Sequence, residues 1–204
     1  TAMVEKLLTA GAGANAVQTS GLTLLMTAAR TGNVQVVNAL LAHGADVNEA
    51  TTETKSTALM WAVAEPHPDI VRALLDAGAD PHTSPVNGFP PLLFAARNGD
   101  IQMAETLIAA GVDVNATGVD GTHALPYAIV SGHDAFALFL LEQGADPNGS
   151  MGGVGALHAA VGRVYTWLGD WNRRHGGRGR YSRFGRMGID PDRRLPLVQA
   201  LLEH

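Results

Sequence analysis

The chain has eight histidines and nineteen acidic residues, the side chain types whose spacing could place acid–base catalysis or a metal. No histidine pair has the H-E-x-x-H or H-x-x-x-H spacing that sets two zinc ligands on one helix. With no cysteine, disulfides, thiol catalysis and thiolate metal sites are excluded. Gly152, Gly153 and Gly155 precede a helical pattern, but no phosphate-loop Gly-Lys-Ser/Thr follows. We therefore expect no catalytic residue, no cofactor and no metal site, and predict that the protein is not an enzyme.

A run of arginines is the second feature that could do chemistry. Residues 1–160 carry fifteen acids against five bases, whereas residues 161–204 carry four acids against nine arginines. The run comprises Arg173, Arg174, Arg178, Arg180, Arg183 and Arg186. Arginines interleaved with glycines and aromatics bind single-stranded nucleic acid, dock on an acidic protein or lipid headgroup, or fold back onto carboxylates of the same chain. All three interpretations stay open, although the acidic remainder of the chain would repel a polyanion.

The elements that must position these side chains repeat along the chain. The marker Gly-Ala-Asp-x-Asn stands at 44–48 and 144–148, and altered copies begin at Gly11, Gly78 and Gly111, so successive markers are 33 or 34 residues apart. Between markers, a leucine followed by small residues precedes an apolar run such as VVNALL or IVRALL. The repeated pattern therefore predicts that each unit contains a turn, a short helix, a tight connection, a second helix and a glycine that ends it.

The last unit departs from this pattern. Ala29 and Val37 in the first complete unit lie 8 residues apart, whereas the matching positions Val161 and Val198 lie 37 apart. About 29 residues are thus inserted between the two helices, roughly over 165–194, and they contain the arginine run. Loops of this length inside compact proteins are usually functional or disordered.

In its period and its motifs the chain resembles the ankyrin-repeat family, whose 33-residue unit is a β-turn plus two helices with a T-P-L-H-x-A signature. The resemblance implies an all-α solenoid of paired antiparallel helices with β-hairpin fingers. It covers residues 1–204 as a single domain of about five repeats plus a leading half repeat. Thr23 and Thr57 keep the signature threonine, whereas Pro90, His123 and Gly155 replace it. Both ends are cut inside a unit without a polar capping face, so we expect a fragment of something longer, or ends covered by a partner.

The surface expected to bind lies on the first helix of each unit. Leu59, Ala62 and Val63 share one face at about 100° per residue, so Trp61 points to the opposite, inner face. The resemblance implies that this face and the fingertips bind partners. The candidate binding residues are Trp61, Phe94, Tyr127, Arg30, Glu65, Arg97, Asn98 and the fingertip residue Phe89. The alternative is that the rings merely pack on neighbouring helices.

These features favour a non-catalytic scaffold that binds another protein or peptide. One alternative is an accessory subunit of a larger multisubunit assembly that docks through the arginine-rich insertion and the uncapped ends. A second, less favoured alternative is nucleic-acid binding. No small-molecule substrate is expected, and no apolar run approaches the ~20 residues of a membrane span. With twelve arginines against two lysines the chain resembles bacterial ankyrin proteins, which slightly favours the periplasm or another extracytoplasmic site over the cytoplasm.

Overall fold

The computed structural model describes residues 2–86, 88–162 and 194–204. The chain divides into two compact units. Unit 1 comprises residues 1–95 and 102–112, and unit 2 comprises residues 96–101 and 113–204. The prediction that residues 1–204 form a single domain stays a prediction.

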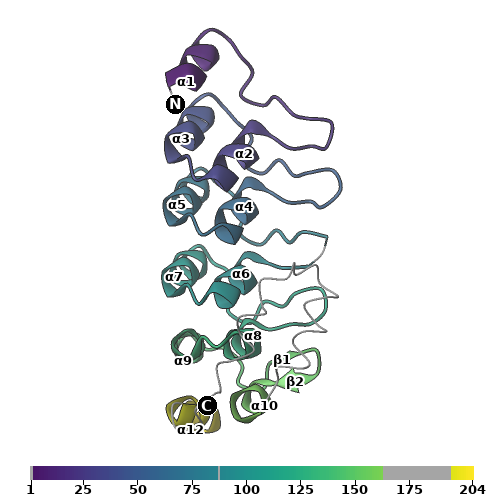
Figure 1. Ribbon diagram of the computed structural model, residues 1–204, viewed down its shortest axis with the longest axis vertical. Coiled ribbons are helices and arrows are strands. Elements are labelled where there is room, and N and C mark those ends of the chain that lie inside the picture. Colours follow the sequence, from purple (N-terminus) through teal and green to yellow (C-terminus); the bar gives the residue numbers. More distant parts are fainter. Residues whose placement is uncertain (1, 87, 163–193) are drawn as a thin grey trace. The chain divides into compact units, whose positions relative to one another are not determined.

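Unit 1 is built from pairs of short helices joined by tight turns. Figure 1 shows α2 and α4 side by side, with α3 and α5 along one side of them and the extended finger loops along the other. The division between the units passes through α6 and the start of α7. The helices are α1 (Ala2–Thr9), α2 (Leu24–Thr31), α3 (Val34–Ala42), α4 (Ala58–Ala64), α5 (Pro68–Asp76), α6 (Pro91–Asn98) and α7 (Ile101–Ala109).

Local signals in the sequence start and stop these helices. The Thr23 hydroxyl accepts a hydrogen bond from the backbone N–H of Met26 at 3.1 Å, which caps the first turn of α2. Thr57 caps α4 in the same way at 3.5 Å, and Pro68 opens α5, where no N–H donor is needed. Gly32 ends α2 with φ 75°, a left-handed conformation that glycine adopts without a steric penalty.

The core of unit 1 is made by the facing sides of these helix pairs. Leu25, Leu40, Leu59 and Leu74 have 1% exposure or less. Each comes from a different helix of α2, α3, α4 and α5. Since a helix of seven to nine residues buries too little surface to stand alone, each pair relies on its neighbours.

Three marker asparagines each connect one finger to the next. Asn48 donates from Nδ2 to the Gly78 carbonyl at 3.0 Å and accepts from the Asp80 backbone N–H at 2.8 Å. Asn15 makes the same pair of bonds to residues 44 and 46, and in unit 2 Asn115 makes them to residues 144 and 146. The asparagine of the motif therefore has a structural role, because both its side chain N–H group and its side chain oxygen form hydrogen bonds to the next finger.

Unit 2 is also built from helix pairs and carries a β-hairpin finger. Its elements are α8 (Ala124–Ser131), α9 (Asp134–Glu142), β1 (Ser150–Met151), β2 (Val154–Gly155), α10 (Ala156–Val161) and α12 (Leu195–Glu203). The two strands pair antiparallel, with Ser150 opposite Gly155. The predicted insertion falls between α10 and α12, and residues 163–193 lie outside the described residues.

Candidate functional site

Helix α4 sorts its side chains between core and surface as its sequence predicts. Leu59, Ala62 and Val63 are buried at 1% exposure or less, whereas Trp61 keeps intermediate exposure. The 100° rotation per residue separates these positions. Trp61 thus lies on the open side of α4, next to α2.

An arginine of α2 stacks on this tryptophan. The Arg30 guanidinium carbon lies 5.4 Å from the centroid of the Trp61 ring, which is cation–π geometry worth about 0.5–1 kcal/mol at an exposed site. Arg30 itself is exposed, and no carboxylate pairs with it among the described residues. Its backbone carbonyl accepts a hydrogen bond from His67 Nε2 at 3.3 Å, which fixes the end of α2 against the turn before α5.

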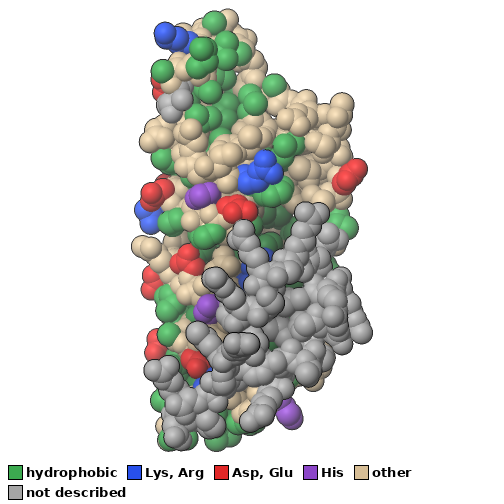
Figure 2. Space-filling model, in the orientation of Figure 1, with side chains coloured by type: hydrophobic (Ala, Val, Ile, Leu, Met, Phe, Trp, Pro, Cys, Tyr) green, Lys and Arg blue, Asp and Glu red, His purple; other side chains and the backbone are tan. Residues whose placement is uncertain are grey.

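An acidic side chain follows at the end of α4. Glu65 is the C-cap residue of this helix and is exposed. Figure 2 shows a basic and an acidic patch beside each other over α2 and α4. The basic residue of α2 is Arg30 and the acidic residue that ends α4 is Glu65, so this surface presents both signs of charge.

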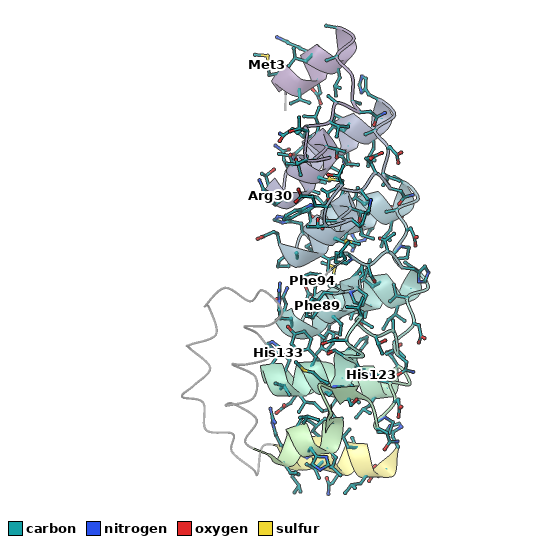
Figure 3. All side chains as sticks on the ribbon, turned by 90° about the vertical axis from the view of Figure 1, so that its right-hand side faces the viewer. Met3, Arg30, Phe89, Phe94, His123 and His133 are labelled. Carbon is teal, nitrogen blue, oxygen red and sulfur yellow. The ribbon has the colours of Figure 1, made fainter. Side chains whose placement is uncertain are left out.

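Two phenylalanines of unit 1 contact each other. The rings of Phe89 and Phe94 are 5.9 Å apart between centroids and tilted by 59°, a favourable arrangement of two aromatic quadrupoles. Both keep intermediate exposure, and Figure 3 shows them together with Arg30 on the side of the inner helices. We call Arg30, Trp61, Glu65, Phe89 and Phe94 the unit 1 inner face. Packing between rings and an accessible surface thus coexist here.

In unit 2 the predicted site residues divide between surface and core. Arg97 donates from Nε to the Asn98 side chain oxygen at 3.5 Å, and its carbonyl accepts from His133 Nε2 at 3.0 Å. Tyr127, in contrast, is only 4% exposed. The other residues of α8 from 124 to 129 are buried as well. Tyr127 therefore does not offer the open ring that the sequence pattern predicts.

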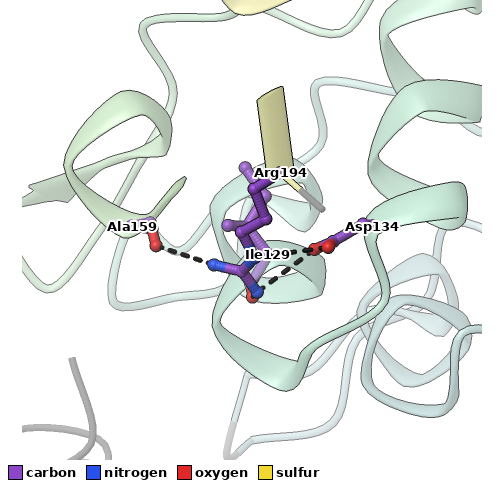
Figure 4. A network of polar contacts seen from close by, with 4 residues as sticks. All are labelled: Ile129, Asp134, Ala159 and Arg194. Atoms are coloured by element: carbon purple, nitrogen blue, oxygen red, sulfur yellow. Dashed lines mark hydrogen bonds and ion pairs between the residues drawn. The ribbon is translucent and has the colours of Figure 1, made fainter. Parts of the chain in front are cut away.

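The six predicted arginines of the insertion, at positions 173, 174, 178, 180, 183 and 186, lie outside the described residues. The described arginine at the end of the segment, Arg194, is 4% exposed. It donates to the carbonyls of Ile129 (2.9 Å) and Ala159 (3.1 Å) and pairs with both carboxylate oxygens of Asp134 at 3.1 and 3.2 Å (Figure 4). Arg194 therefore folds back onto its own chain, whereas the three interpretations of the run at 173–186 stay open.

Sequence reasoning missed the role of Arg194, which it assigned to the insertion. The contacts span 35, 60 and 65 residues along the chain. The one local signal is the position of Arg194 immediately before the apolar run of α12. A single arginine next to an apolar run does not by itself predict a buried ion pair.

An apolar groove of about 340 Å³ opens at the N-terminal end of unit 1. Its walls include Val4 and Leu7 of α1 together with Leu24 and Val36 of the next helix pair. Leu7 and Leu24 are 53% and 44% exposed, and Figure 2 shows hydrophobic side chains gathered over this end. Within the described ranges, no three His, Asp or Glu side chains converge on a point where a metal could bind. No helix there is long and apolar enough to cross a bilayer.

Stacked helix pairs, finger loops and connecting asparagines define a repeat protein. The family model described as "Ankyrin repeats (3 copies)" matches residues 1–85 and 81–151. The chain belongs to the ankyrin-repeat family, and its predicted all-α solenoid class is confirmed. Repeats of this family generally mediate protein–protein interaction.

The curated relatives share the repeats and are much longer. The chain is 36% identical over 101 residues to "Ankyrin repeat and KH domain-containing protein mask-1" of Caenorhabditis elegans, covering 50% of this chain and 4% of that protein. It is 38% identical over 108 residues to "Ankyrin repeat, SAM and basic leucine zipper domain-containing protein 1" of Echinops telfairi, covering 50% and 22%.

A third similarity is shorter. The chain is 52% identical over 58 residues to "Mitochondrial disaggregase" of Bos taurus, covering 28% of this chain and 8% of that protein. The chain thus spans less than a quarter of the length of each of these three relatives. Since all three come from animals, the predicted bacterial type finds no support in them, and the extracytoplasmic location stays a prediction.

Proposed function

We propose that this protein is a binding scaffold that holds a protein or peptide segment on the unit 1 inner face. The observation that carries the proposal is the stack of the exposed Arg30 on the partly exposed Trp61. Tryptophan and arginine are enriched among the residues that dominate binding energy at protein interfaces. The pair is also pre-organised by stacking, so that little side chain entropy is lost on binding.

The phenylalanine pair supports the same function. Phe89 and Phe94 add apolar surface on the same side of the inner helices, and aromatic side chains are enriched at the centre of interfaces. The family to which the chain belongs generally works through such contacts rather than through catalysis.

A peptide-display experiment tests this proposal on the full chain. A random 12-residue library is selected on the immobilised protein, and synthetic copies of the enriched peptides are titrated against variants. We expect Trp61→Ala to weaken binding at least tenfold, while Gln35→Ala, at an exposed position on α3, leaves it unchanged. If peptides are enriched but bind Trp61→Ala as tightly as the wild type, the inner face of unit 1 is not the binding surface.

Docking of the arginine run on a larger assembly and nucleic-acid binding remain alternatives, and they involve residues outside the described part of the chain. The dependence of binding on salt concentration distinguishes these alternatives from the proposed function. Binding that relies on phosphate contacts falls steeply between low and moderate ionic strength, whereas binding to the aromatic surface should persist.

A further inference from the structure

The turn before α5 holds a histidine whose side chain reaches back to the preceding helix pair. His67 is the N-cap residue of α5, yet in the described part of the chain its side chain makes no cap hydrogen bond to that helix. By contrast, Asn33 at the equivalent position before α3 accepts from the backbone N–H of Val36 at 3.1 Å. The His67 Nε2 instead lies 3.3 Å from the Arg30 carbonyl oxygen of α2. Since a carbonyl oxygen only accepts, Nε2 is the donor.

This hydrogen bond satisfies a carbonyl at the end of a helix. The last four carbonyls of a helix have no intrahelical partner, and Arg30 lies in the last turn of α2. The His67 ring can lie this close because residue 32 is a glycine: a Cβ at Gly32 would lie 2.7 Å from the ring atom Cε1. Gly32 thus leaves room for the ring in addition to ending the helix.

The backbone of His67 is fixed on α4, the helix that carries Trp61. The His67 N–H donates to the Ala62 carbonyl at 2.9 Å, and the His67 carbonyl accepts from the Val71 N–H at 3.0 Å. Arg30 is therefore held against the next helix pair at two points. Its carbonyl is bonded to His67, and its guanidinium carbon lies 5.4 Å from the centroid of the Trp61 ring.

The same arrangement recurs in unit 2. The Nε2 of His133 lies 3.0 Å from the Arg97 carbonyl oxygen, and a Cβ at Gly99 would collide with the His133 ring. Where the inner helix lacks this arginine, the next unit has another residue in place of the histidine: Ala64 is followed by Asp100, and Val130 by Arg194. The histidine thus accompanies the arginine of the preceding unit in both places.

We propose that His67 is a positioning residue of the unit 1 inner face, and that its hydrogen bond to the Arg30 carbonyl holds this arginine over the ring of Trp61. This inference rests on the proposed binding function and adds a residue that acts on the surface from behind it. The bond fixes the point from which the Arg30 side chain starts, and stacking selects one of its several staggered rotamers. Without the bond the last turn of α2 frays more readily, and the stacked rotamer is less populated.

Ring-current shifts report the position of the Arg30 side chain directly. Protons above an indole ring move upfield, Arg30→Met identifies the signals, and Trp61→Ala gives their shift without the ring. In His67→Phe, which keeps a ring but has no donor, we expect the Arg30 signals to move toward the Trp61→Ala values. In His67→Gln, whose side chain N–H can replace Nε2, they should stay close to wild type. His133→Phe is the matched control, because it removes the equivalent bond in unit 2 and should leave Arg30 unchanged.

Peptide binding to the full chain gives the second readout. Peptides from the display experiment that depend on Trp61 should bind His67→Phe about two- to fivefold more weakly, the range that one net hydrogen bond supplies. They should bind His67→Gln and His133→Phe as they bind wild type. A loss of stability alone would not move the Arg30 signals of the folded protein, so the two readouts together separate positioning from a merely structural role.

The outcomes distinguish this inference from the proposed function. If the Arg30 signals of His67→Phe equal those of wild type, or if His67→Gln loses the upfield shift to the same extent, His67 does not position Arg30, and the proposed function stands. If no enriched peptide depends on Trp61, the proposed function fails, and with it the role of His67 in binding.

Discussion

Replacement of Arg194 by methionine tests how the last repeat is held together. Methionine keeps a flexible apolar stem but removes every contact of the guanidinium with Ile129, Ala159 and Asp134 (Figure 4). Arg194 stands directly before α12, so we expect the loss to fall on the docking of this helix against α9 and α10.

The magnitude follows from what each partner keeps. The Ile129 carbonyl still accepts a hydrogen bond from the Gly132 N–H at 3.1 Å, so the loss of its bond from Arg194 costs little free energy. The Ala159 carbonyl loses a bond from a charged donor, which is worth about 1.5–3 kcal/mol. The Asp134 side chain is 32% exposed and regains water, so its share is discounted to about 1 kcal/mol. Together these losses amount to roughly 3 kcal/mol, or about a factor of 100 in the opening equilibrium of α12.

Hydrogen exchange is the suitable assay, because it measures the local opening of one helix separately from the unfolding of the whole chain. In the Arg194→Met variant, the amides of α12 between Leu197 and Leu201 should exchange about 100-fold faster. Arg72→Met is the matched control, since its 4.0 Å contact to Asp69 is on the surface and is worth under about 1 kcal/mol. Exchange of α12 within threefold of wild type in Arg194→Met would refute the reasoning.

Three further predictions concern the repeats. Gly32→Ala should destabilise unit 1 by more than Gly44→Ala. Both glycines have positive φ, where an alanine costs about 1–2 kcal/mol. At Gly32 the added Cβ would in addition meet the His67 ring at 2.7 Å, whereas at Gly44 it would meet nothing within 4 Å. His67→Ala in the Gly32→Ala background should recover part of the difference in urea unfolding, and no recovery would contradict the contact. Asn48→Ala should cost about 1–3 kcal/mol, because two bonds between fingers are lost; an unchanged denaturation midpoint would exclude that role. Trp61→Ala should lower the unfolding free energy by under about 1.5 kcal/mol, against about 2–5 kcal/mol for the buried Leu59→Ala, and equal losses would make Trp61 a core residue.

Much of the fold could be predicted from the sequence, because its signals are local and periodic. Glycines such as Gly32 and Gly44 mark places where φ is positive, and the rotation per residue separates Leu59 from Trp61. The Asn of the marker recurs at the helix-pair period, and its bonds reach the next copy of the same motif. Repetition thus turns long-range contacts into a pattern that can be read along the chain.

The candidate site could be predicted only in part. The rotation per residue places Trp61 opposite the core face of its helix. Arg30 and Glu65 stand close to the equivalent inner positions of successive units, so the local pattern and the period were enough to identify all three. The stacking of Arg30 on Trp61 depends on side chain conformations across two helices. No rule of spacing predicts those conformations.

What the sequence by itself determined is therefore the repeated helix pair, its turns and the face that each inner helix turns away from the core. Only the tertiary structure decided that Tyr127, at a position equivalent to Trp61, is buried, and that Arg194 joins α8, α9 and α10. The physical reason is that burial and ion pairing at these positions depend on groups from non-equivalent parts of the chain, up to 65 residues away, where the period no longer tells which residues meet.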